Sequence, residues 1–165
     1  MGKEPFKVGL GVDSHRFQPT MSDKKFVLGG VVVPGHMPID SHSDGDVILH
    51  SLFNALSSSI GEKSIGQFFP DTDPKWKGVD SAVFIEEILK RIRKENYEVG
   101  NVVVSLECKT PKIAPLEAKI KHNVSGLLGI SVNCVAIHAT TGEGLTSVGN
   151  GEGIYGQAVI LLHRV

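Results

Sequence analysis

The sequence predicts an α/β fold, an α+β sandwich in which a single sheet of about four main strands carries helices on one face. Segments with the two-residue period of strands alternate with segments of helical period, and such elements pack economically as one covered sheet. The 165 residues suffice to bury the core of one domain. Because the sequence has no repeats, low-complexity segments or interdomain linker, residues 1–165 are expected to form a single domain.

The first predicted strand carries candidate ligands at its end. Valine or leucine occupies the even positions from 8 to 12, while the odd positions hold two glycines followed by Asp13 and His15. Odd positions of a strand share one face, so Asp13 and His15 project from the same side. The glycines beside them leave room for another backbone or a ligand to come close. A second strand is predicted from Lys25 to Pro34 along the sheet edge, with a bulge or tight bend at Gly29-Gly30.

A helix is predicted to begin near residue 47, after a polar stretch rich in Asp, Ser and His. Ser43 or Asp44 is expected to cap its start. His50 lies one turn after Asp46, so both side chains are expected near the loop that carries His42. The apolar positions recur at the spacing of one helix face: Val47, Ile48, Leu52 and Leu56.

The rest of the chain is predicted to add two helices and three strands. Residues 61–74 are expected to form a loop, and Asp80-Ser81 is expected to cap a second helix with an apolar stripe and a solvated charged face. A third helix follows Pro115 and ends at Gly129. Alternating or apolar segments predict strands over residues 102–108, 132–139 and 157–162.

Composition excludes some classes of function. Seventeen basic and eighteen acidic residues give a formal charge of -1, so polyanion binding is not expected as the main activity and any phosphate must be held locally. The two cysteines lack Cys-x-x-Cys spacing and are expected as core or pocket-wall thiols in a reducing compartment. No apolar run reaches the roughly twenty residues of a membrane span, and residues 1–6 lack a signal-peptide core. We expect a cytoplasmic protein, or a plastid protein whose transit peptide is absent.

Asp13, His15 and His50 together form a candidate metal site. One carboxylate and two imidazoles suit zinc with one coordination position left open. The alternative is that none of the three residues binds a metal, because turns after strands favour Asp and a lone helical His is more often solvated than a ligand.

Two further segments have residues suited to polar ligands. Asp71-Thr72-Asp73 lies between two prolines and suits a polyol or a divalent ion, or alternatively an Asx turn that caps the next element. Thr140-Thr141-Gly142-Glu143-Gly144 precedes a glycine-rich run and offers hydroxyls, backbone donors and a carboxylate to a diphosphate with its magnesium. Its spacing matches neither the P-loop nor the dinucleotide motif. Lys112 either meets a phosphate or is solvated.

Several separated motifs occur in order between about Phe6 and His163. They are Gly11-Val12-Asp13-Ser14-His15, His42-Ser43-Asp44-Gly45-Asp46-Val47 with His50, Phe69-Pro70-Asp71-Thr72-Asp73-Pro74-Lys75 with Lys77-Gly78, Pro111-Lys112, Ala139-Thr140-Thr141 with Glu143, and Glu152-Gly153-Ile154. Together they resemble the 2-C-methyl-D-erythritol 2,4-cyclodiphosphate synthase family of the non-mevalonate isoprenoid pathway.

The resemblance implies a chorismate-mutase-like homotrimer with three active sites, each between adjacent subunits. It implies a zinc ion held by Asp13, His15 and His50, with a substrate phosphate oxygen in the fourth position. A second ion, magnesium or manganese, would bridge the substrate phosphates with Glu143 as its protein ligand.

The resemblance also assigns substrate contacts. The cytidine would bind Cys108, Pro111, Lys112, Ile113, Ala114, Ala139 and Thr140. The remaining substrate contacts would be Ser43, Asp46, Ser64, Ile65, Gly66, Phe69, Pro70, Asp71, Thr72, Asp73 and Asn150.

The implied reaction is a lyase-type intramolecular phosphoryl transfer. The 2-phosphate of 4-diphosphocytidyl-2-C-methyl-D-erythritol 2-phosphate would attack the β-phosphorus, release CMP and close the cyclic diphosphate. His42 and Thr141 would stabilise the developing charge. No nucleic acid or membrane partner is expected.

The sequence departs from the family's common pattern at four positions. Ser64 stands where many members have Asp, Asn54 where an Asp is usual, His138 where a Lys is frequent and Asn150 where an Arg is typical. The last weakens the expectation of an isoprenyl diphosphate in the cavity along the trimer axis. None is a zinc ligand.

Two other functions remain compatible with the residues. A zinc-dependent phosphohydrolase could use the same ligands to activate water, with Asp46 or His42 as the acid or base. A non-catalytic trimeric binding module could use the metal to tie a loop to a strand. Product analysis separates them: cyclic diphosphate with CMP, inorganic phosphate, or no turnover.

Overall fold

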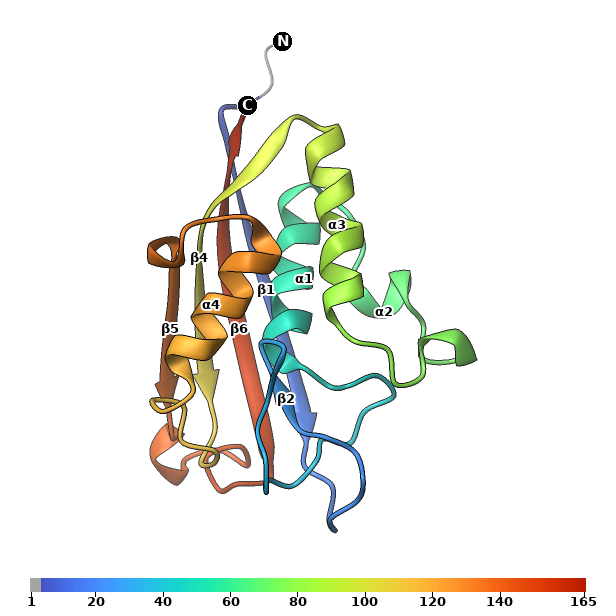
Figure 1. Ribbon diagram of the computed structural model, residues 1–165, viewed down its shortest axis with the longest axis vertical. Coiled ribbons are helices and arrows are strands. Elements are labelled where there is room, and N and C mark those ends of the chain that lie inside the picture. The colour runs from blue at the N-terminus through green and yellow to red at the C-terminus, as the bar shows by residue number, and fades with distance from the viewer. Residues whose placement is uncertain (1–3) are drawn as a thin grey trace.

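A mixed four-stranded sheet forms the frame of the molecule. The computed structural model describes residues 4–165; Met1–Lys3, part of the stretch considered above for a targeting signal, lie outside the described residues. The strand order is β1-β6-β4-β5, with β1 (Phe6–Arg16) antiparallel to β6 (Gly153–Arg164). β4 (Tyr97–Glu107) is antiparallel to β6 and parallel to β5 (Val135–Thr140). The predicted mixed α/β fold with four main strands is confirmed (Figure 1).

Three helices pack on one face of this sheet: α1 (Val47–Ser59), α3 (Ala82–Lys94) and α4 (Glu117–Leu128). The apolar stripe predicted for α3 is buried, at Phe84, Ile85, Ile88, Leu89 and Ile92. α4 ends as predicted, because Gly129 adopts the left-handed conformation (φ 69°) and its N–H caps the last turn.

Close contact between β1 and α1 depends on the two glycines of the strand. A Cβ atom at Gly11 would lie 2.2 Å from the backbone nitrogen of Ala55, and one at Gly9 would lie 1.9 Å from the Ala55 carbonyl oxygen. The expectation that these glycines admit another backbone is therefore confirmed. The alternate side chains of the strand face away from the helices: Val8, Leu10 and Val12 are 66%, 54% and 45% exposed.

The segment from Lys25 to Pro34 differs from the prediction of one strand at the sheet edge. It forms a separate hairpin of β2 (Val27–Leu28) and β3 (Val31–Val32). Gly29 and Gly30 both have positive φ (56° and 74°), as a two-residue hairpin turn requires. The tight bend was predicted correctly, but the flanking residues pair with each other instead of with the main sheet.

Two more segments have helical turns where the sequence predicted other structure. The loop over residues 61–74 contains the short helix α2 (Ile65–Phe68) and leads into a 3-10 turn, η1 (Pro74–Trp76). Ser64 and Gln67 form a capping box at the start of α2. Residues 132–134 form the 3-10 turn η2, because the Ser131 side chain accepts a hydrogen bond from the Asn133 N–H, so β5 begins only at Val135.

The strands β4 and β6 are longer than predicted, and Cys108 lies just beyond the end of β4. A last 3-10 turn, η3 (Gly142–Gly144), follows β5. Within residues 4–165, the helices are too short or too polar for a membrane span.

Candidate functional site

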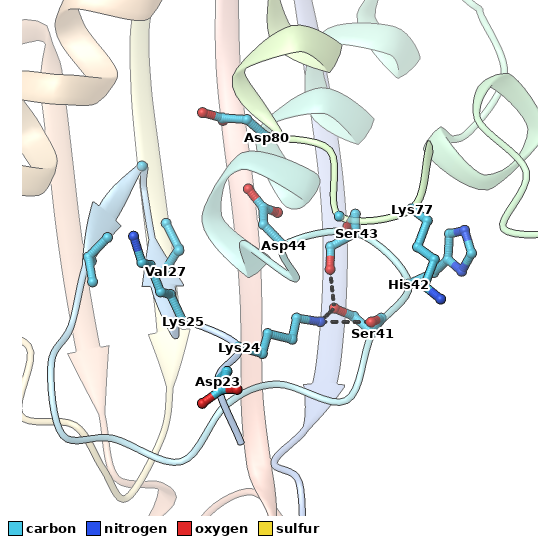
Figure 2. A pocket seen from close by; sticks show the side chains of 13 residues that line it. Asp23, Lys24, Lys25, Val27, Ser41, His42, Ser43, Asp44, Lys77 and Asp80 are labelled. Atoms are coloured by element: carbon cyan, nitrogen blue, oxygen red, sulfur yellow. Dashed lines mark hydrogen bonds between the residues drawn. The ribbon is translucent and has the colours of Figure 1, made fainter. Parts of the chain in front are cut away.

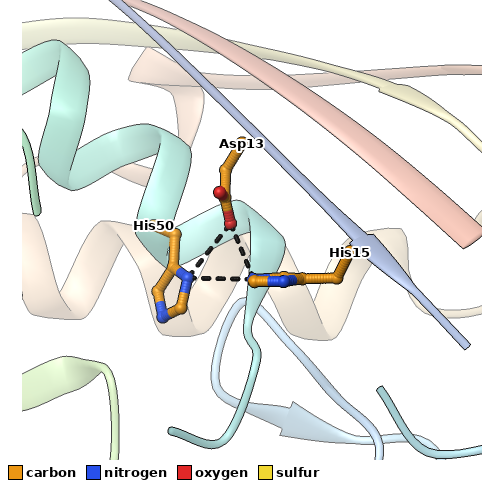
Figure 3. Close-up of side chains that lie close together, drawn as sticks. All are labelled: Asp13, His15 and His50. Carbon is orange, nitrogen blue, oxygen red and sulfur yellow. Dashed lines mark hydrogen bonds and ion pairs between the residues drawn. The ribbon is translucent and has the colours of Figure 1, made fainter. Parts of the chain in front are cut away.

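Asp13, His15 and His50 meet at one point between the sheet and α1 (Figure 3). The Oδ2 atom of Asp13 lies 2.8 Å from Nε2 of His15 and 3.0 Å from Nδ1 of His50. The two ring nitrogens are 3.1 Å apart. Alternation along β1 places the first two residues on the same face, and the close packing of α1 brings His50 to them.

The donor atoms have the spacing that a single zinc ion requires. Bonds of about 2.0–2.2 Å in tetrahedral geometry separate neighbouring ligand atoms by roughly 3.3 Å. The three observed separations, 2.8, 3.0 and 3.1 Å, are close to that value. One carboxylate oxygen and two imidazole nitrogens suit zinc, and three protein ligands leave a position for substrate or water. The group can therefore hold a metal ion.

A second layer of polar groups orients His50. Its Nε2 lies 2.9 Å from Oγ of Ser81 and 3.2 Å from Oγ of Ser43. The Ser81 hydroxyl donates to Asp44 Oδ1 at 2.5 Å, so its lone pairs are available to the Nε2–H of His50. With Nε2 bound to these hydroxyls, Nδ1, the ring atom that faces Asp13 and His15, is the one that would bind a metal ion.

The charges of the cluster support one another. Burial acts to raise the pKa of Asp13, but hydrogen bonds and charge from His15 and His50 outweigh it and lower the pKa to about 2. Burial acts to lower the pKa of His50, but the hydrogen bond and charge of Asp13, with Asp46 and Asp44, raise it overall. Asp13 is therefore anionic across the physiological pH range.

A cavity of about 360 Å³ opens beside the three residues. Among the predicted substrate contacts, Ser43, Ile65, Gly66, Phe69 and Asp71 line it, together with His42. The Nε2 atom of His42 and the Nε1 atom of Trp76, both from lining residues, are buried and have no hydrogen-bond partner within residues 4–165. The described residues therefore leave the hydrogen-bonding capacity of these two ring nitrogens beside the cavity unused.

The other predicted contacts in this region occupy the flanking backbone. Ser64 caps α2, and Pro70 and Thr72 lie in the turn between α2 and η1. Asp73 caps η1 through the Lys75 N–H at 3.1 Å, as in the alternative interpretation of this segment as a capping turn.

Asp46 has a different position from the one predicted. It is completely buried and is the N-cap of α1, where Ser43 or Asp44 was expected. Its carboxylate accepts hydrogen bonds from the N–H groups of Gly29, Gly30, Ile48 and Leu49. These bonds join the β2–β3 turn to the start of α1, which is a structural role, and the carboxylate does not line the cavity described above.

A second group of predicted residues lies at the other edge of the sheet. Ala139 and Thr140 end β5, and the Cys108 N–H donates to the Thr140 carbonyl at 3.0 Å. The Cys108 thiol lies 3.6 Å from the Pro111 carbonyl, and burial raises the pKa of this thiol to about 11. Lys112, Ala114 and Asn150 are exposed, while Ile113 is buried in the core.

Thr141 and Glu143 lie at the turn η3 directly after β5. The Thr141 hydroxyl accepts a hydrogen bond from the Glu143 N–H, and Glu143 has a positive φ of 51°. β1, β4 and β5 run in the same direction, so this turn and the Asp13 cluster lie at the same end of the sheet but on opposite edges. Two intervening strands separate those edges by about 14 Å.

Sequence reasoning missed four residues of the site: Ser41, Trp76, Ser81 and Phe84. Ser81 was assigned only a capping role, and Phe84 only a place in the apolar stripe of α3. Their nearness to His50 results from the packing of α3 against α1, for which no local pattern gives a signal.

Comparisons with known proteins agree with this geometry. The sequence model of the YgbB family matches residues 6–163. The 2-C-methyl-D-erythritol 2,4-cyclodiphosphate synthase of Xylella fastidiosa (strain 9a5c) is 42% identical over 159 residues, which cover 96% of this chain and 89% of the relative. The chloroplastic synthase of Oryza sativa subsp. japonica is 41% identical over 160 residues, 97% of this chain and 71% of the relative.

Solved structures give the same result. The structure titled IspF (Plasmodium falciparum) CDP complex superposes with a TM-score of 0.86 at 31% identity, and each chain is 99% covered. The bifunctional IspDF from Campylobacter jejuni superposes with a TM-score of 0.90 at 28% identity, over 97% of this chain and 42% of the larger one.

Proposed function

The chain belongs to the YgbB family, and from that premise we propose that it converts 4-diphosphocytidyl-2-C-methyl-D-erythritol 2-phosphate to 2-C-methyl-D-erythritol 2,4-cyclodiphosphate and CMP. The reaction is an intramolecular phosphoryl transfer with loss of CMP, in the phosphorus-oxygen lyase class, and supplies isoprenoid precursors. One domain, residues 1–165, carries it in the cytoplasm, or in a plastid as the chloroplastic name of the rice relative suggests.

The observation that carries this proposal is the triangle of Asp13, His15 and His50 beside the cavity. It suits a reaction in which no protein nucleophile is needed, because the substrate's own phosphate attacks. Zinc at this triangle and magnesium or manganese at Glu143 would supply Lewis-acid neutralisation of the phosphate charges.

The chain's own residues then position the substrate and stabilise the charge that develops on its phosphates. The His42 ring, whose buried Nε2 has no hydrogen-bond partner within residues 4–165, would donate to a phosphate oxygen as negative charge develops. The Thr141 hydroxyl would also stabilise the negative charge that develops on the phosphate. The Cys108–Ala114 segment, with Ala139 and Thr140, would hold the cytidine. Such positioning can supply on the order of 7 kcal/mol of barrier reduction.

A site made of both groups of residues requires two subunits. In one chain the Asp13 cluster and the β5 end lie on opposite edges of the sheet, so we propose a chorismate-mutase-like homotrimer in which one subunit's β1 edge faces the next subunit's β5 edge. The uncovered sheet face supports this assembly, since it exposes apolar side chains that a threefold interface would bury: Phe6, Val8, Leu10, Val12 and Val159.

Product analysis tests the proposed reaction. The protein is incubated with the cytidyl substrate, zinc and magnesium, and the phosphorus products are identified by ³¹P NMR. We expect cyclic diphosphate and CMP in equal amounts. Inorganic phosphate as the product would instead indicate a zinc phosphohydrolase, and no turnover would indicate a binding module; either result contradicts the proposal.

A further inference from the structure

A second cavity, of about 560 Å³, is also lined by Ser41, His42 and Ser43 (Figure 2). The segment Ser41–Ser43 therefore contacts both cavities. Lys24 and Lys25 reach the second cavity from the chain that precedes the β2–β3 hairpin. Figure 2 shows the Lys24 side chain extended toward Ser41.

The ammonium group of Lys24 is tied to the backbone on both sides of His42. Its Nζ donates to the Ser41 carbonyl at 2.7 Å and to the Ser41 hydroxyl at 2.6 Å. The Ser41 hydroxyl in turn donates to the Ser43 carbonyl at 3.1 Å. One charged group thus holds the carbonyl before His42 directly and the carbonyl after it through a single hydroxyl.

These contacts are stronger than those of an ordinary surface lysine. Hydrogen bonds from a charged donor are roughly twice as strong as neutral ones. Lys24 is only half-exposed, and burial lowers its pKa while the charges of Asp44 and Asp40 act to raise it. The His42 carbonyl has an anchor of its own, the Gly78 N–H at 3.0 Å. The three anchors restrain the backbone from which the His42 ring extends.

From this geometry we infer that Lys24 is a positioning residue for His42: it fixes the backbone of the Ser41–Ser43 segment so that the His42 ring faces the cavity beside Asp13, His15 and His50. The inference deepens the proposed function and rests on it for its kinetic consequence. A displacement of about 1 Å of a positioned group can cost on the order of 100-fold in rate.

Lys25 is the matched control. It lines the same cavity and carries the same charge, but its side chain makes no hydrogen bond or ion pair within residues 4–165. Lys24→Met and Lys25→Met remove the same ammonium group from neighbouring positions. Lys24→Arg retains a cationic donor that can reach the same two oxygens.

Steady-state kinetics of CMP release give the first readout. We expect Lys24→Met to lower kcat by about 10- to 100-fold with less than about a threefold change in KM, because a misplaced His42 affects the developing charge more than binding. Zinc content should stay that of the wild type, Lys24→Arg should recover part of kcat, and Lys25→Met should stay within about twofold. Equal losses for both Met variants, or wild-type kcat in Lys24→Met, would overturn the inference.

A double-mutant cycle with Ser41→Ala tests the path of the effect. Ser41→Ala removes the hydroxyl link to Ser43 and keeps the bond to the Ser41 carbonyl. If Lys24 acts through this segment, adding Ser41→Ala to Lys24→Met lowers kcat little further. Fully additive losses would contradict the path.

Histidine NMR gives a readout that does not need turnover. In protein labelled with ¹⁵N-histidine, the His42 ring signals are assigned from the His42→Gln variant. They should shift in Lys24→Met and stay in place in Lys25→Met. If the wild type releases no CMP, the proposed function fails while this measurement still decides the role of Lys24; unshifted His42 signals in Lys24→Met would refute that role.

Discussion

The Oδ2 atom of Asp13 lies 3.0 Å from the Nδ1 atom of His50, although 37 positions separate the two residues in the sequence. The contact exists because α1 packs so closely on β1 that only glycine fits at the facing positions of the strand. Gly11 lies two residues before Asp13 and has no side chain to hold the helix away, so His50, one turn before Asn54, reaches the end of the strand.

Loss of either of these ligands should remove zinc without removing the fold. For His50→Ala, and separately for Asp13→Ala, we expect zinc affinity to fall by more than about 100-fold. Loss of a residue that is only hydrogen-bonded to a metal ligand costs roughly 10- to 100-fold. Activity should be lost in parallel while the oligomeric state stays that of the wild type. Metal analysis with light scattering measures both, and His122→Ala, an exposed histidine on α4, is the control. Wild-type zinc stoichiometry in both ligand variants would rule out the assigned ligand set.

Loss of the Ser81 hydroxyl, which is hydrogen-bonded to His50, should have a smaller effect on zinc binding than loss of His50 itself. Ser81 links His50 to Asp44 and does not belong to the triangle of ligands. Ser81→Ala should therefore keep a zinc site but weaken it by about 10- to 100-fold, because the His50 ring loses the acceptor that fixes its tautomer. Competition with a fluorescent chelator measures this affinity. An unchanged affinity would mean that Ser43 alone orients the ring.

Gly11→Ala should destabilise the protein by about 1–3 kcal/mol or more, because the added methyl group has to push apart the backbones of β1 and α1. Gly126→Ala in α4 is the control: nothing lies within 4 Å of a Cβ atom there. That change should stabilise by up to about 1 kcal/mol through helix propensity. Urea unfolding of both variants measures the difference, and equal stabilities would contradict the close packing described here.

The Cys108 thiol should react slowly at neutral pH. Its pKa of about 11 lies above the ordinary value of 9.0, so the reactive thiolate is scarce. The lower thiolate fraction, partly offset by higher nucleophilicity, predicts alkylation about tenfold slower than for an ordinary thiol. The rate should rise with pH until about pH 11. Iodoacetamide labelling of a Cys134→Ser variant gives this profile, and a plateau near pH 9 would refute the raised pKa.

Local periodicity was enough to predict most of the elements, and contacts between distant segments explain where it failed. The buried stripe of α3 and the glycine at the end of α4 depend on neighbours in the sequence, and both are confirmed. The hairpin at residues 27–32 and the turn at residues 132–134 depend on turn chemistry that competes with strand period.

The candidate site shows the same division. Alternation along β1 places Asp13 and His15 on one face, which the sequence predicts. The position of Asp46 beside His42 and His50 suggested a site residue. Its carboxylate instead accepts hydrogen bonds from the N–H groups of Gly29 and Gly30, which lie in a hairpin turn 17 and 16 residues earlier in the sequence. Ser81 reaches His50 only because α3 packs on α1.

In the proposed assembly, residues from opposite edges of the sheet act in one active site shared by two subunits. Co-expression of Asp13→Ala subunits with Glu143→Ala subunits, each inactive alone, tests it directly. Random assembly leaves one intact site in each mixed trimer, so activity should return to about a quarter of the wild-type value. Asp13→Ala mixed with His50→Ala should stay inactive, because both changes affect the same edge. Mixed trimers of the first pair with no recovered activity would contradict the shared site.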